Sequence, residues 1–177
     1  IDAPGLTKKG KHSVGVHHQY CGQLGKQANC HVAVSLSLAN HHASLPVAYQ
    51  LYLPKVWADD SARRAKAGVP EEVTFKTKTE IALDQIRWAC KAGLPRGNAL
   101  LDAGYGNDSK LREGISEEGL TYSAGILPQT SVWKPGIRPS AKPKARNSKD
   151  NAVSVKNLTL GLPEKKWSTF RVPESTK

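Results

Sequence analysis

The sequence has few cysteines, no methionine and no long apolar run. Its three cysteines, Cys21, Cys30 and Cys90, are an odd set without C-x-x-C spacing, which argues against a disulfide scaffold and for reduced thiols. No stretch approaches the roughly 18 apolar residues that span a bilayer, and no signal peptide opens the chain. We therefore expect a cytoplasmic protein with no membrane partner. The missing methionine and the opening on Ile1-Asp2, as though inside a strand, favour a fragment of a longer protein.

Acidic residues are scarce. The chain has 15 Asp and Glu against 26 Lys and Arg, a formal net charge of +11. The positive charge lies at the two ends, with +4 over residues 1–58 and +8 over residues 128–177, while the middle carries −1. Such a surface attracts polyanions, so nucleic acid is the expected partner and an anionic membrane surface the second candidate. A solvated surface without a partner is the third, since net charge does not determine function.

Three common kinds of site lack their motifs. Gly104-Tyr105-Gly106 is neither a phosphate-binding loop nor a dinucleotide motif, so nucleotide binding has no support. No nucleophile elbow or oxyanion loop accompanies a cysteine. A zinc site is imaginable, but its ligands lack the usual spacing, and strand packing of the cysteines with exposure of the histidines is the simpler interpretation. Those ligands would be Cys21, Cys30, His31 and His17 or His18.

Alternating apolar and polar side chains predict strands in the first part of the chain. Residues 13–20 predict a short strand. Residues 30–39 alternate, and a second alternating run over residues 45–53 follows a polar turn, which predicts an antiparallel hairpin. The apolar residues of the second run are expected on one face. Pro46 inside that run indicates an edge strand or a bulge.

Helices are predicted in the middle of the chain. Residues 77–92 have an apolar stripe and capping-box spacing between Thr77 and Glu80, and residues 109–118 follow an N-cap at Asp108. A further helical turn is expected around residues 58–67. The remaining strands of this part are predicted directly before Asp102 and over residues 121–127.

The order of these elements predicts the fold class. Antiparallel strands come first and βα units follow, which indicates an α/β domain over residues 1–127 with a mixed sheet and helices on its faces. Residues 128–177 differ, because six Lys and Arg, three prolines and no acid occur between residues 134 and 149. This stretch is a flexible linker or a loop that wraps a phosphate backbone. Further strands are expected over residues 153–162 and 167–171.

The basic residues that we assign to nucleic-acid contact lie in two groups. Three lysines in the first loop can meet phosphates, although solvated lysines are the more frequent explanation. The first group is Lys8, Lys9, Lys11 and Lys26, and the second is Lys134, Arg138, Lys142, Lys144, Arg146 and Lys149.

Asp102 is the first candidate catalytic residue. A short apolar run ends in this carboxylate and a glycine-rich turn follows, which is how a buried strand delivers a charged side chain to the rim of a sheet. The structural alternative is that Asp102 only caps the turn. If Ile1-Asp2 ends a neighbouring strand, Asp2 and Asp102 become adjacent, and adjacent carboxylates need a divalent cation such as Mg²⁺ or Mn²⁺. Two such ions can cut or join a phosphodiester.

Several strings of residues occur together in this chain. They include Lys8-Lys9-Gly10, Lys11-His12-Ser13-Val14-Gly15-Val16, Gln19-Tyr20-Cys21-Gly22, Trp57-Ala58-Asp59-Asp60, Phe75-Lys76-Thr77-Lys78, Leu101-Asp102-Ala103-Gly104-Tyr105-Gly106 and Ser131-Val132-Trp133. Together they resemble the DDE-type transposases of bacterial insertion sequences, and the resemblance covers most of the chain.

The resemblance implies an RNase H-like catalytic core that cuts and rejoins DNA with three carboxylates and Mg²⁺. Asp102 would be the second carboxylate, and the third is expected on a helix beyond Lys177, after a basic, mostly β insertion. The resemblance also implies a bacterial cytoplasmic protein that associates with the nucleoid when bound to DNA, and a homodimer of the full-length protein.

Two departures from the family pattern affect the expected activity. The family has two consecutive acids where this chain has Asp2-Ala3, and its catalytic acid aligns with Ala3. Residues 172–175 also differ from the family motif, and we do not assign Glu174 to catalysis. We therefore expect a transposase fragment with an impaired site. The alternative is a catalytically inactive nucleic-acid-binding remnant or accessory protein, which would hold DNA equally well without metal.

Overall fold

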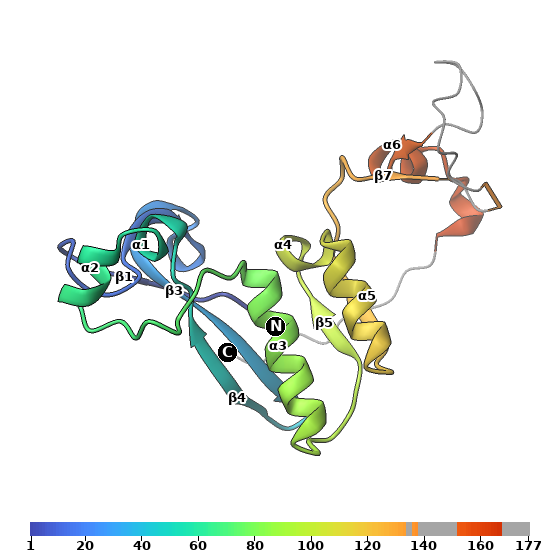
Figure 1. Ribbon diagram of the computed structural model, residues 1–177. Helices are drawn as coiled ribbons and strands as arrows, with labels where there is room; N and C mark the ends of the chain where they lie inside the picture. Colours follow the sequence, from blue (N-terminus) through green and yellow to red (C-terminus); the bar gives the residue numbers. More distant parts are fainter. Residues whose placement is uncertain (134–135, 138–151, 168–177) are drawn as a thin grey trace. The chain divides into compact units, whose positions relative to one another are not determined.

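The computed structural model describes residues 1–133, 136–137 and 152–167, and the chain divides into two units, Ile1–Gly125 and Ile126–Lys177. The elements of the first unit are β1 (Gly5–Thr7), β2 (His17–Cys21), η1 (Gly22–Leu24), β3 (Lys26–Ala39), β4 (Ser44–Leu51), α1 (Lys55–Ala58), α2 (Ser61–Lys66), α3 (Lys78–Lys91), β5 (Ala99–Leu101), α4 (Ala103–Gly106), α5 (Ser109–Glu117) and β6 (Tyr122–Ala124). Those of the second are β7 (Ser131–Val132), β8 (Val153–Ser154), α6 (Val155–Leu160) and η2 (Glu164–Lys166) (Figure 1). The predicted mixed α/β class is confirmed. Within the described ranges, every helix is too short or too polar to cross a membrane.

The longest strand, β3, is the centre of a four-stranded antiparallel sheet. β1 pairs with one edge of β3, while β2 and β4 pair with successive parts of the other edge. The predicted hairpin is confirmed as β3 and β4. The predicted alternation is also confirmed, because Cys30, Val32 and Val34 are all buried on one face of β3.

The bulge predicted at Pro46 is confirmed by a register shift opposite this residue. It corrects the prediction that the apolar residues of the run 45–53 share one face. Leu45 lies on the core side of the sheet, opposite Leu38, whereas Tyr49 lies on the other side and is 62% exposed. The extra residue in β4 reverses the alternation, because a shift of one position moves every following side chain to the opposite face.

β5 and β6 form a separate parallel pair. The single mixed sheet that we predicted over residues 1–127 is therefore present as two separate sheets. The first residues of the chain lie between them, since Asp2 pairs with Ser35 of β3 and Ile1 donates a hydrogen bond to Leu100 of β5. Two residues are too few to form a continuous ladder between the sheets.

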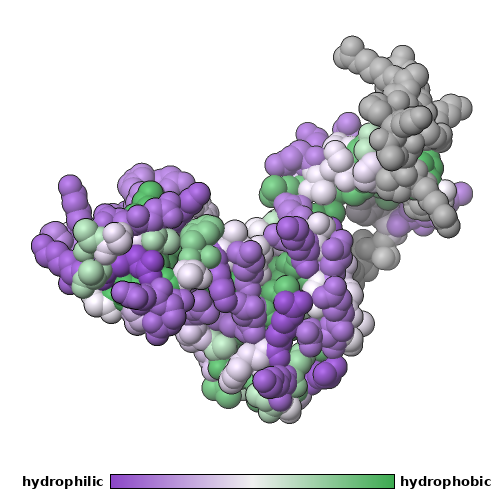
Figure 2. Space-filling model, in the orientation of Figure 1, coloured by the Kyte–Doolittle hydropathy of each residue, from purple (hydrophilic) through white to green (hydrophobic). Residues whose placement is uncertain are grey.

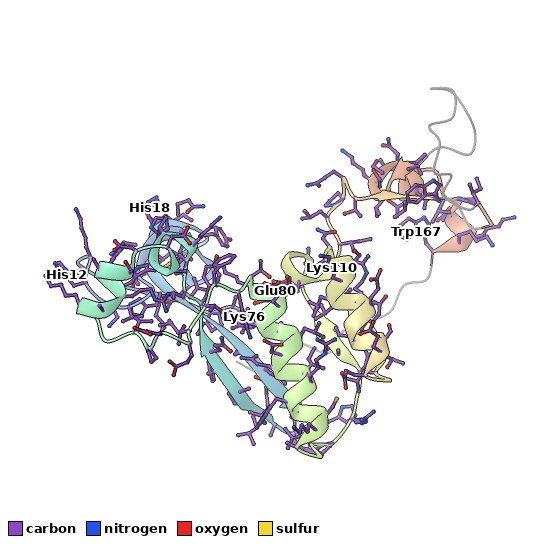
Figure 3. All side chains as sticks on the ribbon, viewed as in Figure 1. His12, His18, Lys76, Glu80, Lys110 and Trp167 are labelled. Atoms are coloured by element: carbon purple, nitrogen blue, oxygen red, sulfur yellow. The ribbon has the colours of Figure 1, made fainter. Side chains whose placement is uncertain are left out.

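The two predicted central helices are confirmed as α3 and α5. α3 begins with a complete capping box, in which the Thr77 hydroxyl accepts from the Glu80 N–H at 3.2 Å and the Glu80 carboxylate accepts from the Thr77 N–H at 2.7 Å. The hydrogen bond from the Thr77 backbone lowers the pKa of Glu80. Figure 3 shows Lys76 and Glu80 at this end of α3 and Lys110 at the start of α5.

The main core lies between α3, α5 and the strands β3 and β5. The face over α3 and α5 in Figure 2 is mostly hydrophilic, while the apolar side chains of these elements are buried beneath it. Gln85 of α3 is a polar member of this interface, and its amide donates to the Val34 carbonyl at 3.0 Å. The buried residues are Val34, Ile81, Ala82, Ile86, Leu101, Tyr105, Leu111 and Ile115.

Asp108 joins the first turns of α5 and α3. Its carboxylate accepts from the Leu111 N–H at 2.9 Å, as predicted for an N-cap, and from the Thr79 hydroxyl at 2.9 Å. The hydrogen bond from Leu111 is the largest cause of a lowered pKa for Asp108. The ionised form of this carboxylate therefore stabilises the folded state.

Asp108→Ala is expected to lower the free energy of unfolding by about 1 kcal/mol at neutral pH, as is usual for a lost N-cap. Because folding lowers the pKa of Asp108, its ionic contribution is complete above the unfolded value of about 3.9 and is lost as pH falls through the folded value. Denaturant unfolding at pH 7 and at about pH 3 measures both effects. A difference between variant and parent that stays constant over this range would contradict an ionic role.

A second, smaller core surrounds Trp57 of α1. Trp57 is fully buried, contacts Val16 and Leu53, and donates from Nε1 to the Val16 carbonyl at 2.8 Å. The helical turn predicted around residues 58–67 is present as α2. In this cluster, α1 and the residues that follow α2 pack against the loop that precedes β2.

The cysteines of the sheet are packing residues. Cys21 and Cys30 are fully buried and form no disulfide, whereas His17 and His18 are exposed. Burial, followed by the neighbouring Cys21, raises the pKa of the Cys30 thiol. The prediction of strand packing for the cysteines and of exposure for His17 and His18 is confirmed, but the predicted exposure is wrong for His31, which is half-buried in β3 because its strand is paired on both edges.

The second unit contains less regular structure in its described part. The strand predicted over residues 153–162 is wrong beyond Ser154, because the Ser154 hydroxyl accepts from the Asn157 N–H at 3.2 Å and begins α6. Most of the basic loop and of the predicted strand over residues 167–171 lies outside the described residues. The mostly β insertion stays a prediction.

Candidate active site

Asp102 lies where β5 ends and α4 begins. Its backbone is extended, with φ −74° and ψ 179°, and its Oδ1 accepts from the Tyr105 N–H at 3.1 Å. The structural alternative left open by the sequence is thus correct in part, since Asp102 is the N-cap of α4. The residue is nevertheless exposed, and Oδ2 takes no part in the cap. Capping and binding of a ligand by this carboxylate are therefore compatible.

Asp2 lies beside the strand that ends in Asp102. It pairs with Ser35 of β3 through backbone hydrogen bonds of 3.1 and 2.9 Å, and its residue is exposed. One residue earlier, the Ile1 ammonium donates to the Leu100 carbonyl of β5 at 3.1 Å. The start of the chain is therefore held between β3 and β5.

Tyr105 of α4 is a buried residue whose phenol is influenced by both predicted aspartates. Tyr105 is 4% exposed, and its buried hydroxyl has no hydrogen-bond partner among the residues that the structure describes. Burial raises the pKa of the Tyr105 phenol most, and the charges of Asp102 and then Asp2 raise it further. The negative charges of both aspartates thus oppose ionisation of the same buried phenol. Our sequence analysis missed Tyr105, although its place between two glycines after Asp102 was a signal.

Two glycines let α4 approach the end of β6 closely. A Cβ atom on Gly106 would overlap the carbonyl oxygen of Gly125 and lie 3.0 Å from the Ala124 Cβ. A Cβ atom on Gly125 would in turn lie 3.0 Å from the Ala103 backbone nitrogen. The turn that carries Asp102 is therefore positioned by direct backbone contact with the neighbouring strand.

Gly106→Ala is expected to destabilise the protein by about 1–3 kcal/mol, the usual range for overpacking, because the obstacle is a backbone carbonyl. Thermal or denaturant unfolding measures this loss. Gly22→Ala is the matched control, since a Cβ there meets nothing within 4 Å, and it should change stability by less than about 0.5 kcal/mol. Equal effects of the two substitutions would contradict the close contact.

The two aspartates fit a divalent cation as part of a ligand set. Carboxylate oxygens are the ligands that Mg²⁺ and Mn²⁺ prefer, and Mg²⁺ usually keeps several waters while binding one or two carboxylates. Residues 1–133, 136–137 and 152–167 contain no group of three or more His, Cys, Asp or Glu that could hold a metal ion. Asp2 and Asp102 would therefore supply two of the ligands and not a complete cage.

The lysines predicted to contact nucleic acid lie away from the aspartates. Lys8, Lys9 and Lys11 are exposed on the loop after β1, where the Asn29 amide donates to the carbonyls of Lys8 and Gly10, each at 2.8 Å. This loop begins about six residues along the strand from Asp2, roughly 20 Å at 3.3 Å per residue.

Lys26 is exposed at the start of β3, at the same end of the sheet as the loop. The other predicted contacts lie outside the described residues: Lys134, Arg138, Lys142, Lys144, Arg146 and Lys149.

Arg63 of α2 supports the lysine loop and was missed by our sequence analysis. Its guanidinium donates to the Lys11 carbonyl at 2.7 Å and stacks over the Trp57 ring at 3.6 Å. The contact with Lys11 spans 52 positions, so no local pattern signals it. Figure 3 shows His12 and His18 in the same part of the first unit.

Comparison with known proteins identifies the family. A family model described as DDE superfamily endonuclease matches residues 1–177. The chain belongs to this family. The resemblance to DDE-type transposases is thereby confirmed, and DDE superfamily nucleases generally use divalent metal ions.

A curated relative of this DDE endonuclease chain has a transposase name. It is the "Probable transposase for insertion sequence element IS701" of Microchaete diplosiphon, 32% identical over 127 residues. The match covers 71% of this chain and 30% of that relative, so the chain spans under a third of the relative's length. No solved structure matches the chain significantly.

Proposed function

We propose that this chain is part of the catalytic core of a transposase that cuts and rejoins DNA at the ends of an insertion sequence. The observation that carries the proposal is the hydrogen bond from the Ile1 nitrogen to the Leu100 carbonyl, which holds Asp2 beside the strand that ends in Asp102. The family match supports the chemistry. The activity belongs to the full-length protein, in which a third carboxylate is supplied from beyond Lys177.

The neighbours of each strand support an RNase H-like core. The order β4, β3, residues 1–7, β5, β6 runs through an antiparallel part and ends in a parallel pair. A central strand between an antiparallel hairpin and a βα unit delivers its side chains to the same edge as the end of β5. We infer that Asp2 and Asp102 occupy this edge for that reason.

Asp2 and Asp102 would hold Mg²⁺ or Mn²⁺ with their exposed carboxylates. The bound ion supplies charge stabilisation at a phosphate group and a template for the attacking and leaving oxygens. The Tyr105 N–H and the first turn of α4 fix the direction of Asp102 through its cap. The chain's own contribution is therefore to orient two anionic ligands at the surface.

Paramagnetic broadening by Mn²⁺ tests the proposed site. In NMR spectra of this chain, substoichiometric Mn²⁺ should broaden the amides of residues 2–3 and 101–106 first. The acidic pairs Asp59-Asp60 and Glu117-Glu118 are internal controls, because each places two carboxylates together elsewhere on the surface. Broadening that begins at either pair and spares residues 101–106 would contradict the assignment.

The lysine loop is proposed to bind the DNA backbone. Replacing Lys8, Lys9 and Lys11 together with Ala should weaken binding of a DNA duplex and reduce the slope of log affinity against log salt by about 3, close to one per phosphate contact. Fluorescence anisotropy over a range of salt concentrations measures both quantities. Lys91→Ala is a control, since this lysine ends α3. An unchanged slope in the triple variant would exclude these lysines from phosphate contact.

A catalytically inactive DNA-binding protein is the second candidate. Ala3, which aligns with the family's catalytic acid, packs against the core near Val34 and against the cluster of Cys21 and Cys30. Calorimetry with Mn²⁺ discriminates the two candidates. The transposase core should bind Mn²⁺, and Ala3→Asp should strengthen binding. DNA affinity that is equal with metal and with chelator, together with no Mn²⁺ binding in either protein, would favour the inactive candidate.

A further inference from the structure

The one-turn helix α4, which follows Asp102, has little stability of its own. It comprises only Ala103–Gly106, with the sequence Ala-Gly-Tyr-Gly. A first helical turn fixes several backbone dihedral angles for a single hydrogen bond, and each glycine costs about 1 kcal/mol relative to alanine inside a helix. The hydrogen bond of this turn runs from the Gly106 N–H to the Asp102 carbonyl at 2.7 Å. Contacts from outside the turn are therefore needed to keep it formed.

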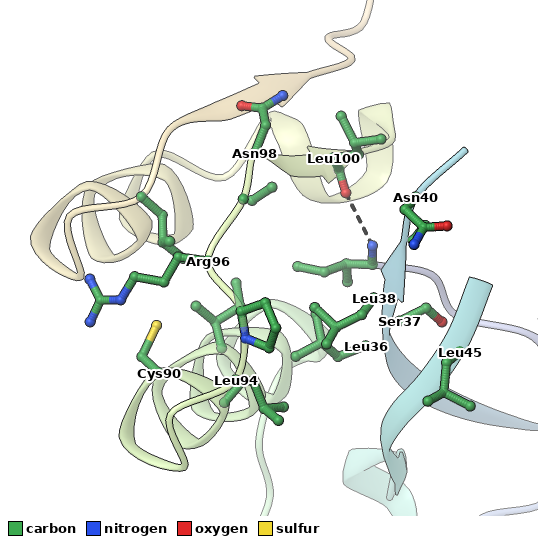
Figure 4. A pocket seen from close by; sticks show the side chains of 18 of the residues that line it. Leu36, Ser37, Leu38, Asn40, Leu45, Cys90, Leu94, Arg96, Asn98 and Leu100 are labelled. Carbon is green, nitrogen blue, oxygen red and sulfur yellow. Dashed lines mark hydrogen bonds between the residues drawn. The ribbon is translucent and has the colours of Figure 1, made fainter. Parts of the chain in front are cut away.

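The direction of the Asp102 carboxylate depends on this turn. Its Oδ1 accepts from the Tyr105 N–H at 3.1 Å, and a Cβ atom on Gly104 would lie 3.2 Å from the same oxygen. On the other side along the chain, Asp102 follows β5. This strand is held by the hydrogen bond from the Ile1 nitrogen to the Leu100 carbonyl, which Figure 4 marks with a dashed line. β5 therefore holds the backbone up to this residue, whereas its side chain keeps one direction only while α4 is formed.

Arg112 of α5 is bonded to the end of α4. Its guanidinium donates from Nη1 to the Gly106 carbonyl, and the last carbonyls of a helix have no partner within the helix itself. This contact is partly buried. The carbonyl end of a helical turn carries partial negative charge and its N–H end partial positive charge. A guanidinium at the carbonyl end and the carboxylate of Asp102 at the N–H end therefore both stabilise α4.

The helix that carries Arg112 is itself fixed in the first unit. Asp108 caps α5 one turn before Arg112, and its carboxylate accepts from the Thr79 hydroxyl of α3 at 2.9 Å. Gly106 also lies against the end of β6, where a Cβ atom would overlap the Gly125 carbonyl oxygen. α4 is thus held by two neighbours, the side chain of Arg112 and the backbone that follows β6.

We infer that Arg112 is a positioning residue for the proposed metal site: it keeps α4 formed and thereby keeps the Asp102 carboxylate in one direction. Arg112 acts through α4 and is not a ligand, since a guanidinium does not coordinate a cation. The inference rests on the proposed function for metal binding by Asp102, whereas the stabilisation of α4 does not depend on it.

Arg112 has no competing ion pair in the part of the chain that the structure describes. Glu113 and Glu117 line the same shallow pocket on α5, but the ion pairs among the described residues are made by Lys76 and Arg87. The hydrogen bond to α4 is therefore the interaction that a substitution of Arg112 removes.

The direction of the change in metal affinity separates positioning from electrostatics. If Arg112 acted only through its charge, removing it would strengthen Mn²⁺ binding, because two positive charges repel each other. A positioning role predicts weaker binding, because a carboxylate that is no longer held must be ordered when the ion binds. Loss of charge and loss of position thus change the affinity in opposite directions.

Three variants of this chain test the inference. Arg112→Met removes the charge and the donor but keeps an unbranched apolar stem. Arg112→Lys keeps a charge and a donor, which suffices where one hydrogen bond is made. Arg87→Met is the matched control, because Arg87 pairs with Glu117 at 3.4 Å and thus joins α3 to α5. Calorimetry measures Mn²⁺ affinity, and NMR measures exchange of the Gly106 amide against the Ala99 amide of β5.

Arg112→Met should weaken Mn²⁺ binding by roughly tenfold, as is usual when a residue that orients a metal ligand is lost. It should also speed exchange of the Gly106 amide by roughly tenfold, because this amide is protected only while α4 is formed. Arg112→Lys should stay within about threefold of the parent in both measurements, because it keeps a charged donor. Arg87→Met should exchange Gly106 like the parent and bind Mn²⁺ at least as tightly.

Unchanged or tighter Mn²⁺ binding by Arg112→Met would overturn the inference, and so would unchanged exchange of its Gly106 amide. A loss in Arg112→Lys or in Arg87→Met as large as in Arg112→Met would overturn it as well. If the parent chain binds no Mn²⁺, the proposed function fails separately. Exchange then decides the inference alone: faster exchange of Gly106 in Arg112→Met supports the hold of Arg112 on α4, and unchanged exchange excludes it.

Discussion

Asp102→Asn is expected to weaken Mn²⁺ binding by this chain by about 10- to 100-fold without unfolding it. At metal sites, the loss of a residue that only orients a ligand already lowers metal affinity by about this factor. Asn caps helices as well as Asp, so the hydrogen bond from the Tyr105 N–H is retained. What is lost is one of two anionic oxygen ligands. Isothermal titration calorimetry with Mn²⁺ measures the change, which in the full-length protein should accompany loss of DNA cleavage.

Asp108→Asn is the matched control for this prediction. Asp108 is also an N-cap, six positions along the chain, and accepts from the Leu111 N–H at 2.9 Å. Its replacement removes the same charge next to α5 but should leave Mn²⁺ affinity within about twofold of the parent, because the Asp108 carboxylate is bonded to Leu111 and Thr79 and is not one of the proposed ligands. Equal losses in the two variants would point to general electrostatic attraction and against a metal ligand at Asp102.

Trp57→Ala is expected to destabilise the protein by about 3–5 kcal/mol, the usual cost of deleting a buried aromatic side chain. Trp57 is fully buried, its Nε1 donates to the Val16 carbonyl at 2.8 Å, and the Arg63 guanidinium stacks on its ring at 3.6 Å. The substitution removes the packing, the hydrogen bond and the stacking partner together. Denaturant unfolding measures the loss, which is a large part of a typical stability of about 5–15 kcal/mol.

Trp57→Phe separates packing from hydrogen bonding. It keeps an aromatic face for Arg63 and leaves only the Val16 carbonyl without its donor, so the expected loss is about 1–3 kcal/mol. The Ala variant should also weaken DNA binding through Lys11, whose carbonyl is held by Arg63. If Trp57→Ala lowers the free energy of unfolding by less than about 1 kcal/mol, the small core around Trp57 does not stabilise the packing of α1 and α2 on the loop before β2.

Prediction succeeded where the determining residues are close in sequence. The helix α3 follows from a capping box between Thr77 and Glu80 within one turn, and α5 follows from the cap at Asp108. Local rules also placed the bulge at Pro46, which cannot donate to a ladder. They did not show that this bulge turns Tyr49 away from the core, since the face of a strand depends on the register with its partner.

In the candidate site, too, only the features set by residues close in sequence could be predicted. Asp102 was identifiable because a short apolar run delivers it to a strand end. Its relation to Asp2 was only a hypothesis, because 99 positions separate Ile1 from the Leu100 carbonyl that holds it. Tyr105 gained its place in the site only from the folded structure, in which its hydroxyl is buried and the charges of both aspartates raise the pKa of its phenol.

The sequence by itself determined the hairpin of β3 and β4, the helices α3 and α5, the buried face of β3 and the caps at Thr77 and Asp108, because these follow from periodicity and hydrogen bonds within a few residues. The family resemblance was also present in the sequence. Only the tertiary structure decided that the start of the chain lies between β3 and β5 and that Arg63 supports the lysine loop. These features arise from contacts between distant segments, which depend on packing of the whole unit and leave no periodic pattern in the chain.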